Sequence, residues 1–463
     1  MTENRREVPF APSIGDRTDG VYASGIRAGR LDPVTLASNF ADLHPPFDDH
    51  EARVEADRCY FCFDAPCMQA CPTRIDIPLF IRQIATGNPI GSARTIFEQN
   101  ILGGMCARVC PVETLCEEAC VRETAEGKPV QIGRLQRHAT DAAFALESHP
   151  FERAAPTGKR AAVVGAGPAG LSCAHRLAVL GHAVTLFEAR DKSGGLNEYG
   201  IAAYKTPDDF AQREVAFVLS IGGIELKAGC RLGRDVTLSD LRRDFDAVFL
   251  GLGLGAVAAL GLEGEELEGV VDAVRWIAEL RQTRDLSTMP VGRRVVVVGG
   301  GMTAIDAAVQ SRLLGAEDVT MVYRRGPERM NASLYEQNLA QTRGVRIRHH
   351  ARPVRALGGD RLRAVEFART TERDGHLVDT GETFELEADM LMKATGQSFE
   401  VDRDADEPLM EQGRIRVDAD RRTDLADVWA GGDFVSVGQD LTVVAVEDGK
   451  IAARSIHRHL QGA

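Results

Sequence analysis

Eight of the ten cysteines in this 463-residue chain stand in two short groups, and they constrain the amino-terminal region more than any other feature. The groups run Cys59-x2-Cys62-x4-Cys67-x3-Cys71-Pro72 and Cys106-x3-Cys110-Pro111-x4-Cys116-x3-Cys120. The opening stretch MTENRREVPF lacks the apolar core of a secretory signal, and no apolar run reaches the roughly 18 residues that span a membrane. We therefore expect a cytoplasmic protein without membrane contact, in which clustered cysteines bind metal more often than they form disulfides.

Thiolates are soft ligands suited to zinc or to iron–sulfur clusters, and the spacing favours the clusters. A dense group that ends in Cys-Pro is typical of bacterial two-cluster ferredoxins, in which the fourth cysteine ligates the other cluster. Spacing alone therefore predicts two [4Fe–4S] clusters that share the groups crosswise, with Cys106 as one of the ligands. Structural zinc and buried thiols without metal are the alternatives. Cys173 lies in an apolar helix pattern and Cys230 near a strand end, so we interpret both as inert core thiols.

A glycine turn follows the apolar strand Ala161–Val164 and opens an amphipathic helix. In the pattern Gly165-x-Gly167-x-x-Gly170, the first glycine permits the turn, the second lets a pyrophosphate approach, and the third lets the helix pack on the strand. The amides at the start of the helix then face the phosphates. Glu188 ends the next strand, where an acid binds an adenosine ribose. The pattern predicts a dinucleotide site, and a tight turn without a ligand is the alternative.

A second glycine turn has the pattern Gly299-x-Gly301-x-x-Ala304 and differs from the first in the residues after its second strand. Tyr323 stands where the first unit has Glu188, and two arginines follow it. A missing acid beside guanidinium groups favours a 2′-phosphate, hence NADPH over NADH, although solvated surface arginines are the alternative. The predicted NAD(P)H-binding residues are Gly299, Gly301, Met302, Thr303, Ala304, Arg324 and Arg325.

The carboxyl-terminal region indicates that the first site binds FAD. Gly431-Gly432-Asp433 precedes an apolar helix that begins near Thr442. An aspartate at a strand end can bind ribityl hydroxyls, and the helix dipole can stabilise negative charge on a reduced flavin. The predicted FAD-binding residues are Gly165, Gly167, Pro168, Ala169, Gly170, Glu188, Gly195, Leu196, Asp433, Thr442 and Val443.

These motifs predict an α/β chain: a helical N-terminal iron–sulfur domain followed by two Rossmann-like nucleotide-binding domains. Because FAD motifs flank the second glycine turn on both sides, we expect the NAD(P) domain to be inserted in the FAD domain, with crossings at Phe249–Gly255 and Lys393–Gln397. The expected boundaries are 1–150 for the α-helical domain with two [4Fe–4S] clusters, 157–290 and 396–463 for the FAD-binding domain, and 291–395 for the NAD(P)H-binding domain. A net charge of -13 argues against a nucleic-acid partner.

Several motifs together resemble a known family. CPTRIDIP, CARVCPVETLCEEAC, GAGPAGLSCAHRL, GGGMTAIDAA, YRRG, KATGQ and GGDF…TVVAVEDGKIAA are similar to the small subunit of NADPH-dependent glutamate synthase and to the amino-terminal half of dihydropyrimidine dehydrogenase. The resemblance implies one cluster on Cys59, Cys62, Cys67 and Cys120 and a second on Cys71, Cys110, Cys116 and Gln136. It leaves Cys106 as a spare thiol, in conflict with the spacing argument, and we follow the resemblance.

The resemblance also implies a function. The family's glutamate synthase chains typically carry glutamate where this chain has Gln136, whereas the pyrimidine enzymes carry glutamine in IGRLQR, as here. We therefore expect the NAD(P)H-dependent FAD/iron–sulfur subunit of a bacterial dihydropyrimidine dehydrogenase, with no catalytic side chain of its own because the cofactors carry the chemistry. The chain ends at Ala463 without the family's flavin barrel, so we expect an FMN-containing partner subunit with ferredoxin-type clusters that reduces uracil or thymine.

Three alternatives are open. The first is the electron-input subunit of glutamate synthase, against which Gln136 argues. The second is a generic ferredoxin- or thiol-linked NAD(P)H oxidoreductase, although the flavin region has no Cys-x-x-Cys for a thiol mechanism. The third is a non-catalytic, zinc-stabilised assembly subunit with degenerate nucleotide sites, against which the intact glycine turns argue.

Overall fold

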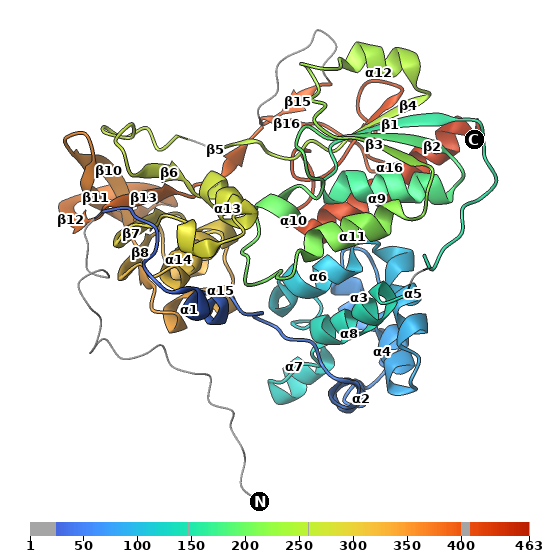
Figure 1. Ribbon diagram of the computed structural model, residues 1–463, viewed down its shortest axis with the longest axis horizontal. Coiled ribbons are helices and arrows are strands. Elements are labelled where there is room, and N and C mark those ends of the chain that lie inside the picture. The colour runs from blue at the N-terminus through green and yellow to red at the C-terminus, as the bar shows by residue number, and fades with distance from the viewer. Residues whose placement is uncertain (1–24, 147, 258, 400–407, 463) are drawn as a thin grey trace, which may run out of the picture.

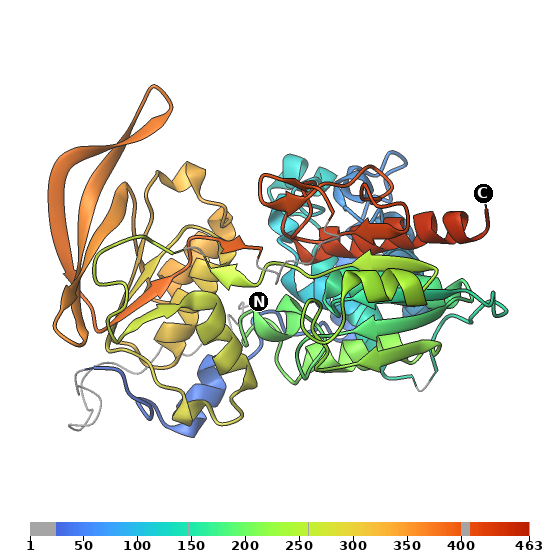
Figure 2. The same cartoon turned by 90° about the horizontal axis from the view of Figure 1, so that it is seen from above.

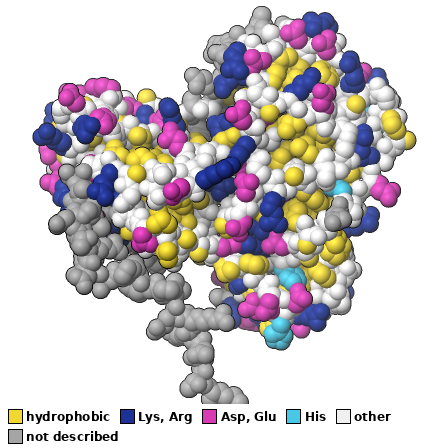
Figure 3. Space-filling model, viewed as in Figure 1, with side chains coloured by type: hydrophobic (Ala, Val, Ile, Leu, Met, Phe, Trp, Pro, Cys, Tyr) yellow, Lys and Arg dark blue, Asp and Glu magenta, His cyan; other side chains and the backbone are white. Residues whose placement is uncertain are grey.

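The computed structural model describes residues 25–146, 148–257, 259–399 and 408–462 as a helical domain and two parallel sheets covered by helices (Figure 1). The opening stretch considered for a secretory signal lies outside these residues. Within the described chain, no helix combines the length and the apolar character needed to cross a bilayer. On the face drawn in Figure 3, the described acidic and basic side chains are interspersed rather than gathered into a basic stripe.

The first eight cysteines lie in a domain of short helices, residues 48–146, which we call the cysteine domain. Asp48, Asp76 and Asn88 each accept a backbone N–H from the first turn of the helix that follows, so every one of these starts is fixed by a polar cap. Phe80 and Leu135 are fully buried between the helices. The elements are α2 (Asp49–Ala56), α3 (Pro66–Ala70), α4 (Ile77–Ala85), α5 (Pro89–Gln99), α6 (Gly103–Val109), the 3-10 turn η1 (Val112–Thr114), α7 (Val121–Glu126) and α8 (Ile132–Phe144).

The first Rossmann unit is built on a parallel sheet with the strand order β17-β4-β1-β2-β3. Because β1 lies between β4 and β2, the strand order reverses direction at its carboxyl end, which is where ligands bind in such sheets. The strands are β1 (Arg160–Val164), β2 (Ala183–Phe187), β3 (Ile224–Lys227), β4 (Ala247–Leu250) and β17 (Val428–Ala430). The remaining elements are α9 (Pro168–Val179), α10 (Leu196–Tyr199), α11 (Phe210–Leu219), α12 (Leu238–Asp244), α16 (Thr442–Leu460) and the small pair β15 (Met410–Glu411) and β16 (Arg414–Ile415).

The second Rossmann unit repeats this plan with the parallel order β6-β13-β7-β8-β9. An antiparallel meander, β10-β11-β12, packs at its side and projects as a long hairpin (Figure 2). The strands are β6 (Val270–Asp272), β7 (Arg294–Val298), β8 (Asp318–Val322), β9 (Arg346–Arg348), β10 (Ala351–Gly358), β11 (Leu362–Arg373), β12 (His376–Glu387) and β13 (Met390–Lys393). The helices are α13 (Ala273–Gln282), η2 (Leu286–Thr288), α14 (Met302–Leu313), η3 (Pro327–Arg329) and α15 (Leu334–Thr342).

The chain passes between the two Rossmann units through a pair of very short strands. β5 (Ala256–Val257) leads out of the first unit, β14 (Gln397–Ser398) leads back, and the two pair antiparallel. The second unit is therefore inserted into the first, as the predicted fold class requires.

Two segments lie elsewhere than sequence order suggested. Helix α1 (Pro33–Asn39) precedes the cysteine domain but packs on the second unit, where Asn39 Nδ2 donates to the carbonyl of Leu313 at 2.8 Å. Strand β6 precedes residue 291, the expected start of the inserted domain, yet it pairs with β13 in the second sheet. A three-residue strand carries too little periodicity to reveal its sheet.

Candidate cofactor-binding sites

The first thiol set consists of Cys59, Cys62, Cys67 and Cys120. Cys59 and Cys62 lie in the loop before α3, Cys67 lies on α3, and Cys120 is the residue that precedes α7. Burial, together with the thiols of Cys59, Cys120 and Cys62, raises the pKa of Cys67 to about 12. The structure thus brings together the four cysteines that the resemblance assigned to one cluster.

The loop that carries the first thiol set contains two residues in a strained backbone conformation. Phe61 and Ala65 have φ values of 51° and 39°, in the left-handed region that non-glycine residues rarely adopt. Phe61 N donates to Cys59 Sγ at 3.4 Å. Such strain persists only where the surroundings fix it and is concentrated at functional sites.

The second thiol set consists of Cys71, Cys110 and Cys116. A hydrogen bond with Cys106 and burial raise the pKa of Cys110, and the thiols of Cys116 and Cys71 lie close enough to add to the effect. Burial also raises the pKa of Cys116, with Glu117, Cys71 and Cys67 as further contributors. The two sets are therefore neighbours, and Cys106 lies beside the second.

Gln136 lies on α8, and its amide orientation is set by a single contact. Nε2 donates to the backbone carbonyl of Gly103 at 2.7 Å. A carbonyl oxygen can only accept, so the amide nitrogen must face it, and Oε1 must point elsewhere. Among the described contacts none occupies Oε1, which therefore stays available as an oxygen ligand.

The thiol sets supply soft ligands of the kind that iron–sulfur clusters use. Among the described residues, no three or more His, Cys, Asp or Glu side chains converge as ligands of one metal ion. Two adjacent groups of soft ligands fit two clusters. The individual ligand assignments stay predictions.

The first glycine turn has the close packing that a pyrophosphate site requires. Gly165 has φ 95°, and a Cβ at Gly170 would overlap the carbonyl oxygen of Gly165. Gly167 precedes α9, whose first turn has no side-chain cap, so its N–H groups are available to phosphates. A Cβ at Gly195 would lie 2.8 Å from the Cα of Gly167, so these two glycines form a narrow cradle.

Two polar side chains border this cradle. Glu188 is 8% exposed, and its Oε2 accepts from the backbone N of Ala166 at 2.8 Å, which holds the carboxylate beside the turn. Each carboxylate oxygen has a second lone pair for a ribose hydroxyl. Ser193 Oγ is buried and has no hydrogen-bond partner among the described residues, as expected where a polar ligand supplies it.

The carboxyl-terminal segment closes the same site. Burial and the nearby Asp440 raise the pKa of Asp433 to about 6. Asp448 accepts from the backbone N of Gly432 at 2.9 Å and fixes the turn that carries Asp433. Thr442 at the start of α16 donates to Asn197 Oδ1 at 2.9 Å, next to Gly195 and Leu196. The predicted FAD residues therefore come from elements that meet at the carboxyl end of β1.

The second glycine turn combines one close backbone contact, at Gly299, with an open position at Gly301. A Cβ at Gly299 would overlap the carbonyl oxygen of Ala394, whereas a Cβ at Gly301 would meet no atom within 4 Å. Helix α14, which carries Met302, Thr303 and Ala304, has no side-chain cap at its first turn. This open amide end fits a dinucleotide phosphate.

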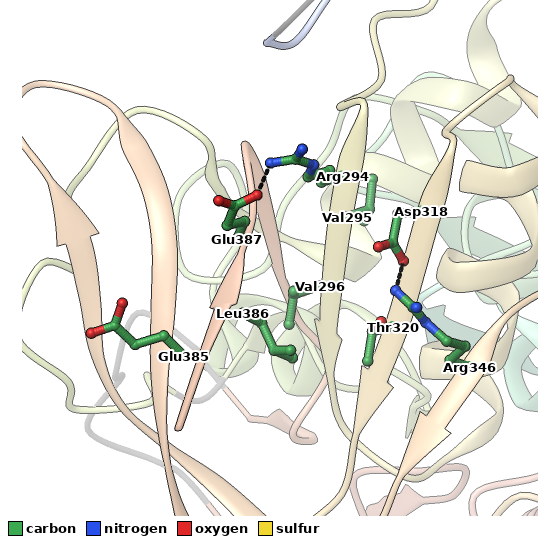
Figure 4. Close-up of a pocket in the computed structure, with 9 residues that line it drawn as sticks. All are labelled: Arg294, Val295, Val296, Asp318, Thr320, Arg346, Glu385, Leu386 and Glu387. Atoms are coloured by element: carbon green, nitrogen blue, oxygen red, sulfur yellow. Dashed lines mark hydrogen bonds and ion pairs between the residues drawn. The ribbon is translucent and has the colours of Figure 1, made fainter. Parts of the chain in front are cut away.

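The residues after β8 are held by the meander. Thr370 Oγ1 donates to the carbonyl oxygen of Arg324 at 2.7 Å, and Arg325 Nε lies 3.3 Å from a carboxylate oxygen of Glu372. A cavity of about 270 Å³ lies at the opposite, amino-terminal ends of β7 and β8. Arg294 contacts Glu387 there, and Arg346 contacts Asp318 (Figure 4). Ligands of parallel sheets bind at the carboxyl ends, so we assign no nucleotide to that cavity.

Four polar side chains at or near the candidate sites lay outside the sequence prediction: Ser193, Asp448, Lys450, which donates to the carbonyl of Thr73, and Glu372. Asp448 and Lys450 are polar residues within the apolar pattern of α16, and that mismatch was a usable signal. Ser193 adjoins the predicted Gly195. Glu372 has no local signal, because only the tertiary fold brings β11 to the end of β8.

Fold and sites together define a two-nucleotide oxidoreductase of Rossmann architecture with a thiol-rich helical domain. The family model for dihydropyrimidine dehydrogenase domain II, with a 4Fe-4S cluster, matches residues 36–148, and that for pyridine nucleotide-disulphide oxidoreductases matches residues 159–449. The NAD-dependent dihydropyrimidine dehydrogenase subunit PreT of Salmonella typhimurium is 35% identical over 92% of this chain and 98% of its own length. The small chain of NADPH glutamate synthase from Escherichia coli is 34% identical over 91% and 94%. The chain belongs to the family that contains these two proteins.

Solved structures agree on the fold. FprA of Mycobacterium tuberculosis in complex with NADPH superposes with a TM-score of 0.56 at 19% identity, over 66% of this chain and 85% of that one. The comparisons confirm the predicted fold class and family resemblance. The matched domains also confirm an oxidoreductase with FAD, NAD(P)H and [4Fe–4S] as its cofactor classes.

Proposed function

We propose that this chain is the electron-input subunit of a dihydropyrimidine dehydrogenase, which oxidises NAD(P)H on behalf of a partner subunit that reduces uracil or thymine to the 5,6-dihydropyrimidine. The observation that carries the proposal is Gln136, whose Nε2 donates to the carbonyl of Gly103, so that no described contact occupies its Oε1. The 35% identity to a PreT subunit supports the same reading.

The chain's own residues bind and position the cofactors. Gly165, Gly167 and the α9 amides take the FAD pyrophosphate, Glu188 its ribose and Asp433 its ribityl chain. Gly301 and the α14 amides take the nicotinamide dinucleotide. The first thiol set holds one cluster, and the second set with Gln136 holds the other. When bound, the nucleotides supply hydride chemistry and the clusters supply one-electron transfer.

A buried contact joins the first Rossmann unit to the cysteine domain, as electron transfer between them requires. Glu214 of α11 accepts from the backbone N of Met105 at 2.9 Å, at the start of the helix that leads to Cys110. The buried contact holds α6, which ends directly before Cys110, against α11 of the first Rossmann unit. The partner we propose is an FMN-containing subunit with ferredoxin-type clusters, and the assembly is a hetero-oligomer.

The experiment is reconstitution of anaerobically purified protein with that partner. We expect a brown protein with flavin absorbance, bleaching by NAD(P)H, and NAD(P)H-dependent uracil reduction only when both subunits are present. Colourless protein without iron and flavin would refute the proposal.

The second candidate is the small subunit of glutamate synthase, favoured by the 34% identity to the Escherichia coli small chain. It predicts glutamate formation from glutamine and 2-oxoglutarate when a glutamine-dependent large chain is added. Measuring both products with both partners separates the two functions.

A further inference from the structure

The second Rossmann unit lacks an acid at the end of its second strand, and a distant strand supplies one. Tyr323 follows β8 where Glu188 follows β2 in the first unit. Glu372, on β11 of the meander, directs its carboxylate to the loop after β8 instead. A carboxylate therefore reaches this loop from another part of the chain.

The carboxylate borders a cavity of about 420 Å³ next to the loop that follows β8, a position that binds the adenosine ribose in Rossmann units. Arg325, Glu328, Arg329 and Asn331 line it from that loop, and Glu372 lines it from the hairpin. One oxygen of Glu372 lies 3.3 Å from Arg325 Nε, and the other lies 3.9 Å from a terminal nitrogen of Arg329.

The strand that carries Glu372 is anchored at this position. Thr370, which is 4% exposed, bonds to the carbonyl oxygen of Arg324, and its backbone N donates to His350 at 2.9 Å. Residues two apart on a strand share a face, so Glu372 stands on the same face as the anchored Thr370. The carboxylate is thus held at the cavity by the fold.

The charges around the cavity are balanced. Arg325 and Arg329 are offset by Glu328 and Glu372, and Glu372 already pairs with both guanidinium groups. A 2′-phosphate carries about -1.5 to -2 charges and needs guanidinium groups that are free of a carboxylate. A ribose 2′-hydroxyl, in contrast, donates to a carboxylate.

We propose that Glu372 selects NADH over NADPH, by accepting the 2′-hydroxyl of the adenosine ribose and by holding the two arginines that a 2′-phosphate would need. This inference rests on the proposed function and names the donor that it uses. It reverses the preference that Tyr323, Arg324 and Arg325 indicate when read from the sequence alone.

The test compares flavin reduction by NADH and by NADPH in the intact holoprotein, as kcat/KM under anaerobic conditions. The wild type should favour NADH by at least about tenfold, and Glu372→Gln should shift the NADH/NADPH ratio toward NADPH by at least about tenfold. The matched control is Glu382→Gln, which removes an exposed ion pair with Arg369 on the same meander and should leave the ratio unchanged.

A second measurement probes the 2′-position directly. Adenosine 2′,5′-bisphosphate should inhibit Glu372→Gln more strongly relative to AMP than it inhibits the wild type. A wild type that prefers NADPH, or a variant with the wild-type ratio, overturns the role of Glu372 while the proposed function stands. Flavin that neither nucleotide reduces overturns both.

Discussion

Lys450 of α16 donates from Nζ to the carbonyl oxygen of Thr73 at 2.9 Å, so a buried charge of the first Rossmann unit contacts the cysteine domain two residues after Cys71. Nζ also lies 3.1 Å from Gln99 Oε1 and 2.6 Å from Glu447. The same helix begins beside the flavin cradle. One element thus bridges the flavin site and the second thiol set.

Replacing this lysine should weaken the contact between domains. Lys450→Met leaves the Thr73 carbonyl and the Glu447 carboxylate without their buried donor, so we expect the free energy of unfolding to fall by about 2–4 kcal/mol. Lys159→Met, which removes a half-exposed lysine paired with Asp246, is the control and should change it by less than about 1 kcal/mol. Denaturant unfolding measures both; equal losses would contradict the bridge.

The two neighbouring thiols Cys110 and Cys106 should differ in their effect on iron. Cys110→Ala removes an assigned ligand, so iron per chain should fall by about half while FAD stays bound and NAD(P)H still bleaches it. Cys106→Ala should keep the wild-type iron content, since Cys106 contacts Cys110 but is not an assigned ligand. Iron analysis and EPR of anaerobic protein decide the point. A loss of iron in Cys106→Ala as well as in Cys110→Ala would favour the ligand set that spacing predicted.

Gln136→Ala should also remove about half of the iron, because it deletes the only oxygen assigned to the second cluster. The matched control is Gln131→Ala, at the residue that directly precedes α8. The Gln131 side chain accepts from Arg134 at 3.1 Å and is not an assigned cluster ligand. Iron analysis compares the two variants. Full iron content in Gln136→Ala shows that another group is the ligand.

Glycine-to-alanine changes can separate folding from binding at the second turn. A Cβ at Gly301 meets no protein atom within 4 Å, so Gly301→Ala should keep the wild-type Tm but raise KM for the nicotinamide nucleotide at least about tenfold by blocking the phosphates. Gly359→Ala, equally unhindered but on the meander, is the control. An unchanged KM would show that the nucleotide does not bind at this turn.

Glu214 should make the stability of the protein depend on pH. Burial raises its pKa to about 8, well above the usual value of 4.5. Between about pH 5 and 8 the folded protein holds a proton that the unfolded chain has lost, so stability falls as pH rises, by up to about 1.4 kcal/mol per pH unit. Glu214→Gln should flatten this slope, and Glu225→Gln on exposed β3 should not. Parallel slopes in all three proteins argue against a raised pKa.

The sequence predicted the parts of the molecule that have local rules. Gly165, Gly170 and Gly299 mark turns whose geometry depends on a few neighbouring residues, and the structure shows the close backbone contacts that exclude a side chain there. The grouping of Cys59, Cys62 and Cys67 with Cys120 followed from the family resemblance, because no local rule relates residues so far apart.

Long-range contacts defined what the sequence missed. Lys450 meets Thr73 across 377 positions, and Glu372 reaches Arg325 only because the meander packs against β8. Helix α1 packs on the second unit through apolar contacts. An amphipathic pattern shows that a helix has an apolar face, but it does not show which part of the molecule covers that face. Arg325 is an example. Its positive charge could be seen in the sequence, but its pairing with the carboxylate of Glu372 could not.

The inserted unit is joined to the rest of the chain through the backbone at two places, and buried Lys205 adds a further tie by pairing with Asp306 and Glu336 at 2.8 Å. The paired strands β5 and β14 form one joint, and the residues between α1, which packs on the inserted unit, and α2 of the cysteine domain form a strap. A rotation about the joint pulls on that strap. The nicotinamide-binding body and the thiol-bearing helices are therefore mechanically coupled, and neither can swing far without loading the other.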